Sequence, residues 1–579
     1  MPFGQKTSQR IANPPGNPHA KSVAGTMLAR QFSRWSIVAG VALIAAAAAF
    51  VYLPSIRGGY LLDDEGLLKE APWVTSNNGL SHIWFSTEVP DYWPLTYSMF
   101  WAEWHCWGDH PLGYHVVNLV LHILAALLVW LILHKLKIPG AFLAGLLFAV
   151  HPVNVESVAW IAQRKNTLAM VWFLLSIWAF LKSDELKIDQ SQRSLFDRWF
   201  WFSLLSFILA LLSKGSVAIL PGILLGLVWW QRKEIVRRDF VRLAPFVVVA
   251  VIFVGINIWF QKHSNTIEIR HADIVERTLG AAGTIWFYLY KALWPTDLAF
   301  IYPQWHIEKS GFIWWLALAA AVAVTVLLWR QRNNRWGKAL LFAWGFFCVA
   351  LLPVMGFTDV GFMRFSLVAD HYQHIAIIAV VALVAAGWGL LYNKATGVLR
   401  DLTLVAAGAI VAALAVLARE QSFLYTDAVT SYRAAIEKNP GLWMLHGNLG
   451  DALFDAGDIK AAVPELREAL RLNPESDDAY FYLAEAMVHD GDYAKAIEYY
   501  KKALAIEPDN MKANSHLANL YYQRGQFAEA QATADEAMTL AKQHQAKYLI
   551  EKIEQWKTNH PLGQRTSAPG FEVPPPISP

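Results

Sequence analysis

Residues 36–66 read SIVAGVALIAAAAAFVYLPSIRGGYLLDDEG. The apolar part, Ser36 to Pro54, is long enough to cross a bilayer as a helix, and no clear cleavage site follows it. Because the preceding residues are basic, the positive-inside rule keeps the N-terminus in the cytoplasm and makes the segment a retained anchor. The acidic cluster of Asp63, Asp64 and Glu65 then emerges on the outer side, next to the membrane surface.

The composition also indicates a membrane protein. The 579 residues are 55% hydrophobic and 16% charged, whereas about 25% of a soluble domain is charged. The 27 Trp and 31 Phe residues fit aromatic belts at the membrane interfaces. A net charge of +3 argues against a nucleic-acid-binding protein, and two distant cysteines indicate neither a disulfide framework nor a metal site.

Hydropathy and loop charges predict about eleven membrane spans. The basic loops alternate with acidic ones, so the side of each loop follows from the positive-inside rule. Segment 279–294 is ambiguous, and we expect a re-entrant or surface helix there, because a further span would place a basic loop outside. An odd number of spans places the C-terminus outside. The predicted spans are 36–54, 113–133, 140–152, 166–182, 199–212, 216–230, 243–260, 311–329, 338–356, 372–391 and 402–418.

A strict period appears after residue 420. Pro440, Pro474 and Pro508 are separated by 34 residues each, and several Gly and Ala positions share that step. Three consecutive units of this length are the tetratricopeptide-repeat signature, and stacked repeats form a groove that binds peptides or other proteins. We therefore predict an all-α chain, a polytopic membrane helical bundle followed by a tetratricopeptide-repeat superhelix. The predicted parts are a basic cytoplasmic N-terminus (1–35), a membrane domain (36–420), a repeat domain (421–545) and a terminal helix with a disordered Pro-rich tail (546–579).

Four polar groups lie at the predicted outer face, where ionisable residues in lipid are costly and usually functional. Each also has a structural interpretation: hydrogen bonding between helices for the His and Asn residues, and snorkelling to headgroups for the Lys and Arg residues. Arg164 and Lys165 violate the charge bias, which favours a clamp on a phosphate. Two histidines near residue 372 lack a third ligand at metal-binding spacing. The groups are His115, Asn118 and His122; His151, Asn154, Glu156, Arg164 and Lys165; Lys214; and Asp370, His371, Tyr372 and His374.

Several motifs occur in a characteristic order along residues 36–545. They are Asp63-Asp64, Trp93-Pro-Leu-Thr96, Gly113-Tyr-His-Val-Val-Asn118, His151-Pro-Val-Asn-Val-Glu156, Gln163-Arg-Lys-Asn166, Leu212-Ser-Lys214 and Asp370-His-Tyr-Gln-His374, followed by the repeats. This order resembles the TMTC family, the transmembrane and tetratricopeptide-repeat proteins of the GT-C glycosyltransferase superfamily. The chain is most similar to bacterial relatives of that family.

The resemblance implies an inverting transfer of a sugar from a polyprenyl-phosphate carrier to Ser or Thr hydroxyls of exported proteins, in animals linked to O-mannosylation. Asp63 and Asp64 match the family's catalytic acids, with Glu65 tuning the pair. Arg164, Lys165, Lys214 and His371 would bind the donor phosphate, and the repeats would present protein or peptide acceptors. The expected location is the bacterial inner membrane, with the repeats in the periplasm. No further cofactor is implied, and the sugar and any divalent metal stay open.

The chain departs from the family pattern at three places. Trp93 stands where the family often has Arg, Gly215 where the animal proteins have Glu, and His371 where they have Arg. The phosphate-binding groups are therefore rearranged or the donor differs. The rival interpretation is a non-catalytic, membrane-anchored repeat scaffold for protein assembly, for which the repeats alone would suffice.

Overall fold

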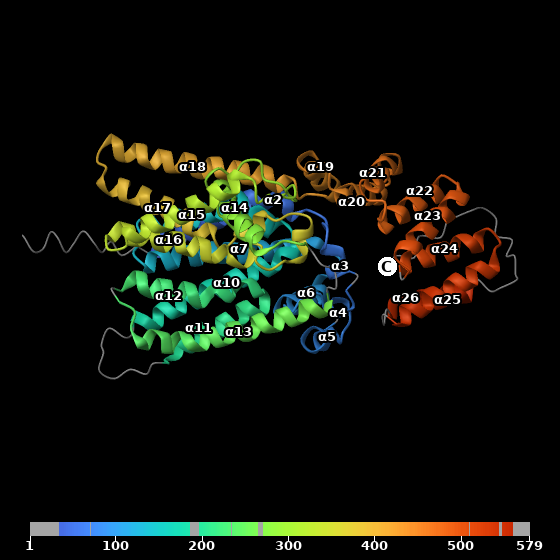
Figure 1. Ribbon diagram of the computed structural model, residues 1–579, viewed down its shortest axis with the longest axis horizontal. Helices are drawn as coiled ribbons and strands as arrows, with labels where there is room; N and C mark the ends of the chain where they lie inside the picture. Colours follow the sequence, from blue (N-terminus) through green and yellow to red (C-terminus); the bar gives the residue numbers. More distant parts are fainter. Residues whose placement is uncertain are drawn as a thin grey trace, which may run out of the picture.

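The computed structural model describes residues 34–559, with gaps at residues 70, 88, 186–195, 233, 265–269, 509 and 544–546. The described residues form helices and no β-strand. A bundle of long apolar helices is followed, at one end of its long axis, by a superhelix of short paired helices (Figure 1). The predicted all-α architecture is confirmed. The predicted cytoplasmic segment up to residue 33 and the Pro-rich tail from residue 560 lie outside the described residues.

The predicted spans coincide with apolar helices. Among the described residues, eight helices are long and apolar enough to cross a membrane, and a bent helix pair makes a ninth. Two shorter apolar helices, α11 (Arg198–Ser213) and η3 with α12 (Gly215–Gln231), coincide with the fifth and sixth predicted spans. The eight, the bent pair and the two short helices together account for the eleven predicted segments. The long helices are α2 (Arg34–Ile56), α7 (Pro111–Lys135), α10 (Arg164–Glu185) preceded by η2 (Ile161–Gln163), α13 (Arg237–Ser264), α15 (Phe312–Arg330), α16 (Arg335–Leu351) continued by η4 (Leu352–Val354), α17 (Ile377–Lys394) and α18 (Val398–Phe423).

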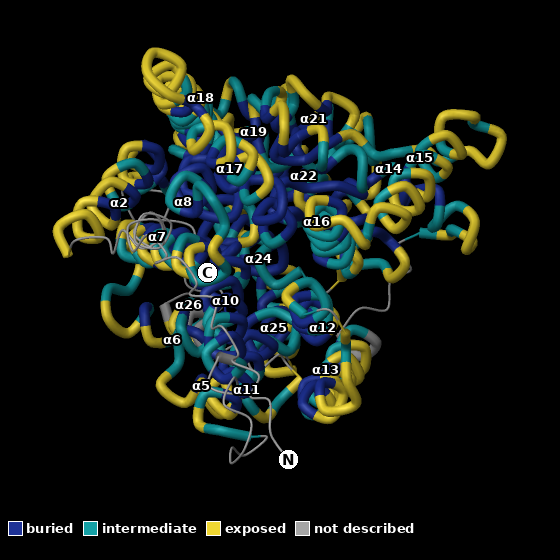
Figure 2. The backbone as a smooth tube through the Cα atoms, turned by 90° about the vertical axis from the view of Figure 1, so that its left-hand side faces the viewer, coloured by how far each residue is buried: buried dark blue, intermediate teal, exposed yellow. Residues whose placement is uncertain are grey.

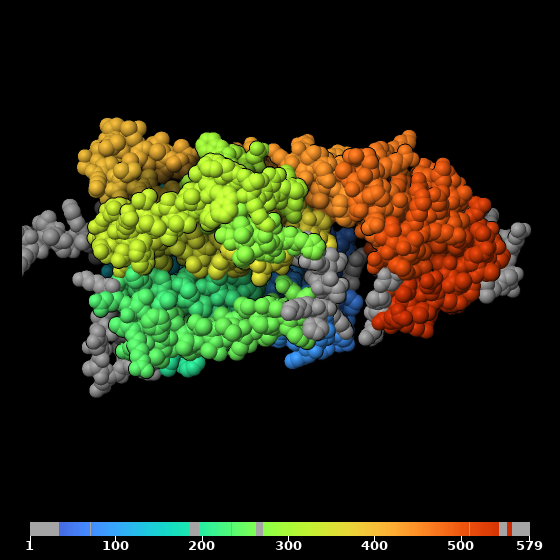
Figure 3. Space-filling model, viewed as in Figure 1, coloured from blue at the N-terminus to red at the C-terminus, as the bar shows by residue number. Residues whose placement is uncertain are grey.

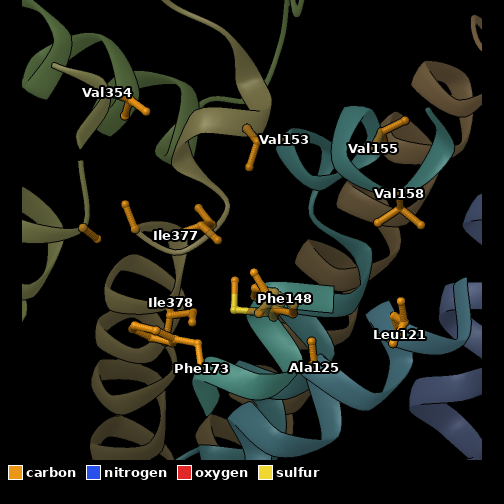
Figure 4. Packing of buried hydrophobic residues seen from close by; sticks show 14 of the residues in the cluster. Leu121, Ala125, Phe148, Val153, Val155, Val158, Phe173, Val354, Ile377 and Ile378 are labelled. Atoms are coloured by element: carbon orange, nitrogen blue, oxygen red, sulfur yellow. The ribbon is translucent and has the colours of Figure 1, made fainter. Parts of the chain in front are cut away.

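The third predicted span is the bent pair. Helix α8 (Ala141–Val150) ends before a proline, whose missing N–H and ring stop the helical ladder, and the chain restarts as η1 and α9 (Pro152–Ala159) at an angle of 56°. Figure 4 shows Val153 and Val158 of the restart in the same buried cluster as Phe148 of α8. The bend therefore places a short polar-lined turn inside one end of the bundle.

The bundle has a buried centre and a lipid-facing periphery. The span that includes α10 is 78% buried, whereas α15 is only 6% buried. Viewed end on, α13, α15 and α18 lie at the periphery with largely exposed backbones, while the centre is buried (Figure 2). Because these exposed helices are apolar, their outer faces suit a hydrocarbon environment.

Segment 279–294 forms part of α14 (Ile274–Leu293), which does not have the composition of a span. Asp273 caps its N-terminus in a capping box with Glu276. The helix packs against α15 and α17. Helix α14 is long enough to cross a membrane, but its start is too polar for a span. Its placement as a surface or re-entrant helix, in preference to a twelfth span, stays a prediction.

The loop between α2 and α7, predicted to lie outside, is folded into short helices at the bundle end that faces the repeats (Figure 1). Their packing is largely aromatic, and the indole N–H of Trp101 donates to the Ser76 carbonyl at 2.8 Å. The loop therefore forms a compact cap over that end of the bundle. Its helices are α3 (Asp64–Leu68), α4 (Pro72–Thr75), α5 (Gly79–Phe85) and α6 (Pro94–Trp107).

The repeat domain follows the 34-residue period. Gly457, Gly491 and Gly525 occupy the turns between paired helices with φ of +80°, +78° and +75°, where a side chain would be strained. The last span ends at Phe423, beyond the predicted domain boundary at 420, and the single helix α19 follows it and packs against α20. The helices are α19 (Ala428–Lys438), α20 (Trp443–Asp455), α21 (Ile459–Leu472), α22 (Asp477–His489), α23 (Tyr493–Ile506), α24 (Met511–Gln523), α25 (Phe527–Gln543) and α26 (Lys547–Asn559).

Candidate active site

Asp64 anchors the loop after α2 to the helical bundle. Its side chain is buried at the start of α3, where one carboxylate oxygen accepts the Leu61 N–H at 2.9 Å and the other accepts the Ala162 N–H at 2.7 Å. Burial raises the pKa of Asp64 to about 8, although both backbone donors oppose that shift. Since both oxygens are occupied, Asp64 holds the loop and does not face solvent.

Asp63 and Glu65 flank this anchor and are exposed. Within the described part of the chain, the Asp63 carboxylate has no hydrogen-bond or ion-pair partner. The Glu65 carboxylate instead pairs with Lys69 one helical turn later, at 3.0 Å. Of the three predicted acids, Asp63 is therefore the one that is both accessible and uncommitted.

The repeat domain holds the same loop from the other side. The Leu62 N–H, next to Asp63, donates to the hydroxyl of Tyr432 on α19 at 2.9 Å. The Gly59 N–H donates to the carbonyl of Thr426 at 3.3 Å, and Lys438 forms an ion pair with Asp297. Figure 3 shows the repeats joined to the upper part of the bundle end. The position of Asp63 therefore depends on both domains.

Arg164 lies inside the bundle, not at its surface. The side chain is fully buried, Nε donates to Asn118 Oδ1 at 2.5 Å, Nη2 donates to the Tyr114 carbonyl at 2.7 Å, and Nη1 forms an ion pair with Glu103. The prediction placed this guanidinium on a donor phosphate. In the structure its fork is engaged by α6 and α7, so it fixes the start of α10, from which Lys165 and Asn166 project.

Two lysines provide the accessible positive charge beside the acids. Lys165 lies over the Trp93 ring, with Nζ 4.9 Å from the ring centroid. Lys214 occupies the break between α11 and η3 and donates to the side-chain oxygen of Asn166. Burial lowers the pKa of Lys214 to about 7, and the charge of Lys165 adds to that effect. This arrangement brings together two cations that are 49 residues apart in sequence.

The sequence analysis did not identify two carboxylates at this site as functional residues. Burial raises the pKa of Asp91, while the charges of Lys165 and Lys214 lower it, so Asp91 lies within reach of both cations. Glu103 is buried as the counterion of Arg164. Asp91 lies two residues before Trp93 of the Trp-Pro-Leu-Thr motif, and this proximity was the available signal. Nothing in the sequence connected Glu103 with Arg164.

The predicted group at residues 370–374 forms a short strap, η6 (Asp370–Gln373), bound to the bent span. Glu156 accepts the His371 backbone N–H at 2.8 Å and contacts the ring Nδ1 at 2.8 Å, and His374 Nδ1 lies 3.0 Å from Asn154 Oδ1. Asp370 accepts the Tyr302 hydroxyl at 3.0 Å. The strap and the bent span, about 200 residues apart, are thus fixed to each other.

A small polar pocket of about 20 Å³ lies between the strap and Lys214. The hydroxyl of Tyr372 and Nε2 of His374 are buried and have no hydrogen-bond partner among the described residues. Burial and the charges of Lys214 and Lys165 lower the pKa of His371 well below its usual range, while Asp63 opposes this shift. The pocket is lined by Asn166, Ala169, Lys214, Ser216, Val217, Ala350, Val354, His371, Tyr372, His374 and Ile375.

The remaining predicted polar residues connect helices in the interior. His122 and His151 each contact a backbone carbonyl with Nε2, those of Ala149 and Ala292, at 3.0 Å. Asn118 donates to the Trp160 carbonyl at 3.2 Å, and His115 is buried with both ring nitrogens unpartnered among the described residues. These residues do not enter the pocket. No group of three or more His, Cys, Asp or Glu suited to a metal ion occurs in the described residues.

Two family models for the tetratricopeptide repeat match the C-terminal part of the chain. One matches residues 412–462 and 448–510, and the other matches residues 487–553. The matches cover the helices of the repeat domain, so the predicted repeats are confirmed.

Curated relatives match in sequence as well. The chain is 32% identical over 156 residues to the protein O-mannosyl-transferase Tmtc1 of Drosophila melanogaster, covering 25% of this chain and 18% of the relative. It is 33% identical over 156 residues to the protein O-mannosyl-transferase TMTC1 of Mus musculus, covering 24% and 17%. Over these stretches the chain is similar to the TMTC proteins. The matches span about a fifth of those relatives' length.

The chain is also similar to a solved structure. The crystal structure of the oligosaccharyltransferase from Archaeoglobus fulgidus in the apo form matches 68% of this chain and 57% of that chain, with 13% identity and a TM-score of 0.40. With its apolar helices, the chain is a multi-pass membrane protein.

Proposed function

We propose that the chain is a membrane glycosyltransferase that moves a sugar from a polyprenyl-phosphate donor to Ser or Thr hydroxyls of exported proteins. One arrangement carries the proposal: Asp63 is exposed and uncommitted, its neighbour Leu62 is hydrogen-bonded to the repeat domain, and its charge reaches His371 of the polar pocket that Lys214 also lines. The curated relatives bear the name protein O-mannosyl-transferase, which agrees with this chemistry. The site corresponds to the periplasmic face of a bacterial inner membrane.

Asp63 acts as the general base in this proposal. Its carboxylate takes the proton of the acceptor hydroxyl, and the oxygen attacks the anomeric carbon from the face opposite the phosphate. The bond from that carbon to the phosphate oxygen breaks, and the electron pair leaves with polyprenyl phosphate. The configuration at the anomeric carbon is thereby inverted. Asp64 positions the base by fixing the loop to Ala162.

The phosphate gains one negative charge as it leaves, so groups that bind it more tightly at that stage accelerate transfer. Lys214 and Lys165 supply positive charge, and the Tyr372 hydroxyl supplies an unused donor. Because the pocket is small, a phosphate oxygen enters it while the rest of the group stays at its mouth. Asp91 balances the two cations when no donor is bound. Arg164 and His371 are positioning residues, held by Glu103 and Glu156.

The repeats present the acceptor. Helix α20 of the first complete repeat faces the acid loop: burial raises the pKa of Asp451 to about 7, and the nearby charges of Asp455 and Glu65 add to that shift. A peptide in the repeat groove therefore passes close to Asp63. Glu65 lies on the acceptor side of the loop, where it pairs with Lys69 and does not contact the proposed base.

The proposal is tested by glycopeptide mass spectrometry of the cell envelope, comparing wild type with Asp63→Asn. A matched control is Asp109→Asn, because Asp109 is a half-exposed acid of the same outer loop whose 3.4 Å contact with Lys69 lies away from the pocket. Loss of a defined sugar mass from exported proteins in the first variant alone supports the proposal. Unchanged glycosylation with the stably expressed Asp63→Asn protein would leave the repeat scaffold as the better interpretation.

A further inference from the structure

The indole of Trp93 lies beside the lysines of the candidate site, and the proposed reaction gives it no role. The ring is half-buried, at the residue directly before α6. Lys165 Nζ covers one face of it, 4.9 Å from the ring centroid. Within the described part of the chain, the indole N–H has no hydrogen-bond partner, whereas that of Trp84 in the same loop donates to Ser98 at 2.9 Å. Trp93 therefore combines an unused donor with a ring face that is covered by an ammonium group.

The backbone around Trp93 is fixed relative to Lys214. The Trp93 N–H donates to the Asp91 carbonyl at 3.0 Å, which holds the residue at the start of α6. In the first turn of that helix, Thr96 Oγ1 donates to the carbonyl of Ser213 at 2.9 Å. Ser213 directly precedes Lys214. The indole and the Lys214 ammonium are therefore carried by elements that are bound to each other.

Trp93 contacts side chains that lead to both ends of the proposed reaction. One is Lys165, whose charge reaches Lys214 at the phosphate pocket. The other is Tyr97, which stacks on the indole with ring centroids 6.4 Å apart and an angle of 26° between the planes, and which the charge of Asp63 reaches. Because the acceptor oxygen attacks from the face opposite the phosphate, the sugar ring has to lie between the base and the phosphate. Trp93 lies in that interval.

The chemistry around the indole suits a neutral sugar. The C–H groups of a pyranose form an apolar face that packs on an aromatic ring, and a hydroxyl group of the sugar accepts the indole N–H. The charges of Asp63 and Asp91 both reach Tyr97, beside the ring. Two carboxylates so placed disfavour an acidic sugar by like-charge repulsion. The surroundings of Trp93 therefore fit a neutral hexopyranose.

We propose that Trp93 is the platform for the donor sugar, on which a neutral hexopyranose stacks once Lys165 has moved from the ring to the phosphate. This inference rests on the proposed function for the identity of the donor. The exchange replaces a cation–π contact by a contact between the ring and the sugar C–H groups, and the ammonium gains an anionic partner. Since the ring and the phosphate compete for one ammonium group, phosphate binding uncovers the sugar subsite.

The test compares two ligands of equal charge that differ in the sugar. Full-length protein in nanodiscs is titrated, without an acceptor, with undecaprenyl phosphate mannose and with methyl undecaprenyl phosphate, both of which are phosphodiesters. The proteins are wild type, Trp93→Ala, Trp93→Phe and the control Trp104→Ala. Trp104 is a half-buried tryptophan of α6, about 16 Å further along the helix at its rise of 1.5 Å per residue.

Wild type should bind the mannosyl diester about tenfold more tightly than the methyl diester, as a single ring contact supplies. Trp93→Ala should abolish this ratio by weakening the mannosyl diester alone. Trp93→Phe keeps an aromatic face without the N–H and should retain part of the ratio, and the control should retain all of it. Equal binding of both diesters by wild type, an unchanged ratio in Trp93→Ala, or equal weakening of both ligands in that variant would overturn the inference.

A second variant tests the exchange itself. Lys165→Gln should weaken both diesters severalfold, because each phosphate loses the ammonium group that leaves the ring. Wild-type affinity of Lys165→Gln for the methyl diester would mean that Lys165 stays on the indole, and would overturn the exchange. The expected binding pattern without mannose transfer to a Ser- or Thr-containing peptide would contradict the proposed function and leave the assignment of Trp93 intact.

Discussion

Asp63 and Asp64 are adjacent in sequence, yet the structure predicts opposite consequences for replacing them with Asn. Asp63 is exposed and has no partner in the described part of the chain, so Asp63→Asn should change stability by less than about 0.5 kcal/mol. Because it removes the proposed base, sugar transfer should fall about 10²- to 10⁴-fold.

Asp64→Asn should destabilise the protein as well. Both oxygens of Asp64 accept backbone N–H groups, from Leu61 at 2.9 Å and Ala162 at 2.7 Å, in a buried position. An asparagine offers only one acceptor oxygen, so its NH₂ group faces one of these donors and leaves it unpaired. An unsatisfied buried group costs about 1–3 kcal/mol. The melting temperature should therefore fall, and transfer should fall with it because the loop that carries Asp63 is no longer fixed.

The assay compares thermal unfolding of the purified, detergent-solubilised variants with the initial rate of transfer to a peptide acceptor. The expected pattern is an inactive but stable Asp63→Asn protein and an inactive, less stable Asp64→Asn protein. Activity retained in Asp63→Asn, or a wild-type melting temperature together with lost activity in Asp64→Asn alone, would refute the division of roles between the two acids.

Three further predictions concern groups around this loop. Tyr432→Phe removes the acceptor of the Leu62 N–H, so transfer should fall severalfold while the repeats stay folded; unchanged hydrogen exchange at Leu62 would contradict this. Lys214, with a pKa of about 7, is charged below that pH and loses its proton above it, so the donor KM should rise above pH 7 in wild type but not in Lys214→Arg. Identical pH profiles would exclude Lys214 as a phosphate ligand. Glu103→Gln leaves the buried Arg164 without its counterion and should cost about 3–5 kcal/mol, seen as a lower melting temperature that a second change, Arg164→Met, largely restores; a wild-type melting temperature in the single variant would argue against the ion pair.

The sequence identified candidate residues that lie around one site, but it did not distinguish their roles. Arg164 was predicted to bind the donor phosphate because a positive charge on the outer side of the membrane violates the charge bias. Its partner is Glu103, 61 residues earlier in the chain, which has no motif of its own. Asp91 had been counted only as a negative charge of the outer loop, and its proximity to Lys165 and Lys214 appears once α6 packs on α11.

The spans and the repeats were determined by the sequence alone. An apolar run such as 36–54 and a step of 34 residues are local signals, because each helix satisfies its own backbone hydrogen bonds and each repeat contacts its neighbours. The tertiary structure decided which carboxylate is free, which cation is buried and which aromatic ring lies beside the lysines. Those properties depend on contacts such as Asp64 with Ala162, 98 residues apart, and on helices that meet only when the bundle is packed. The sequence specifies the chemistry of each side chain, but packing determines its exposure and its partners.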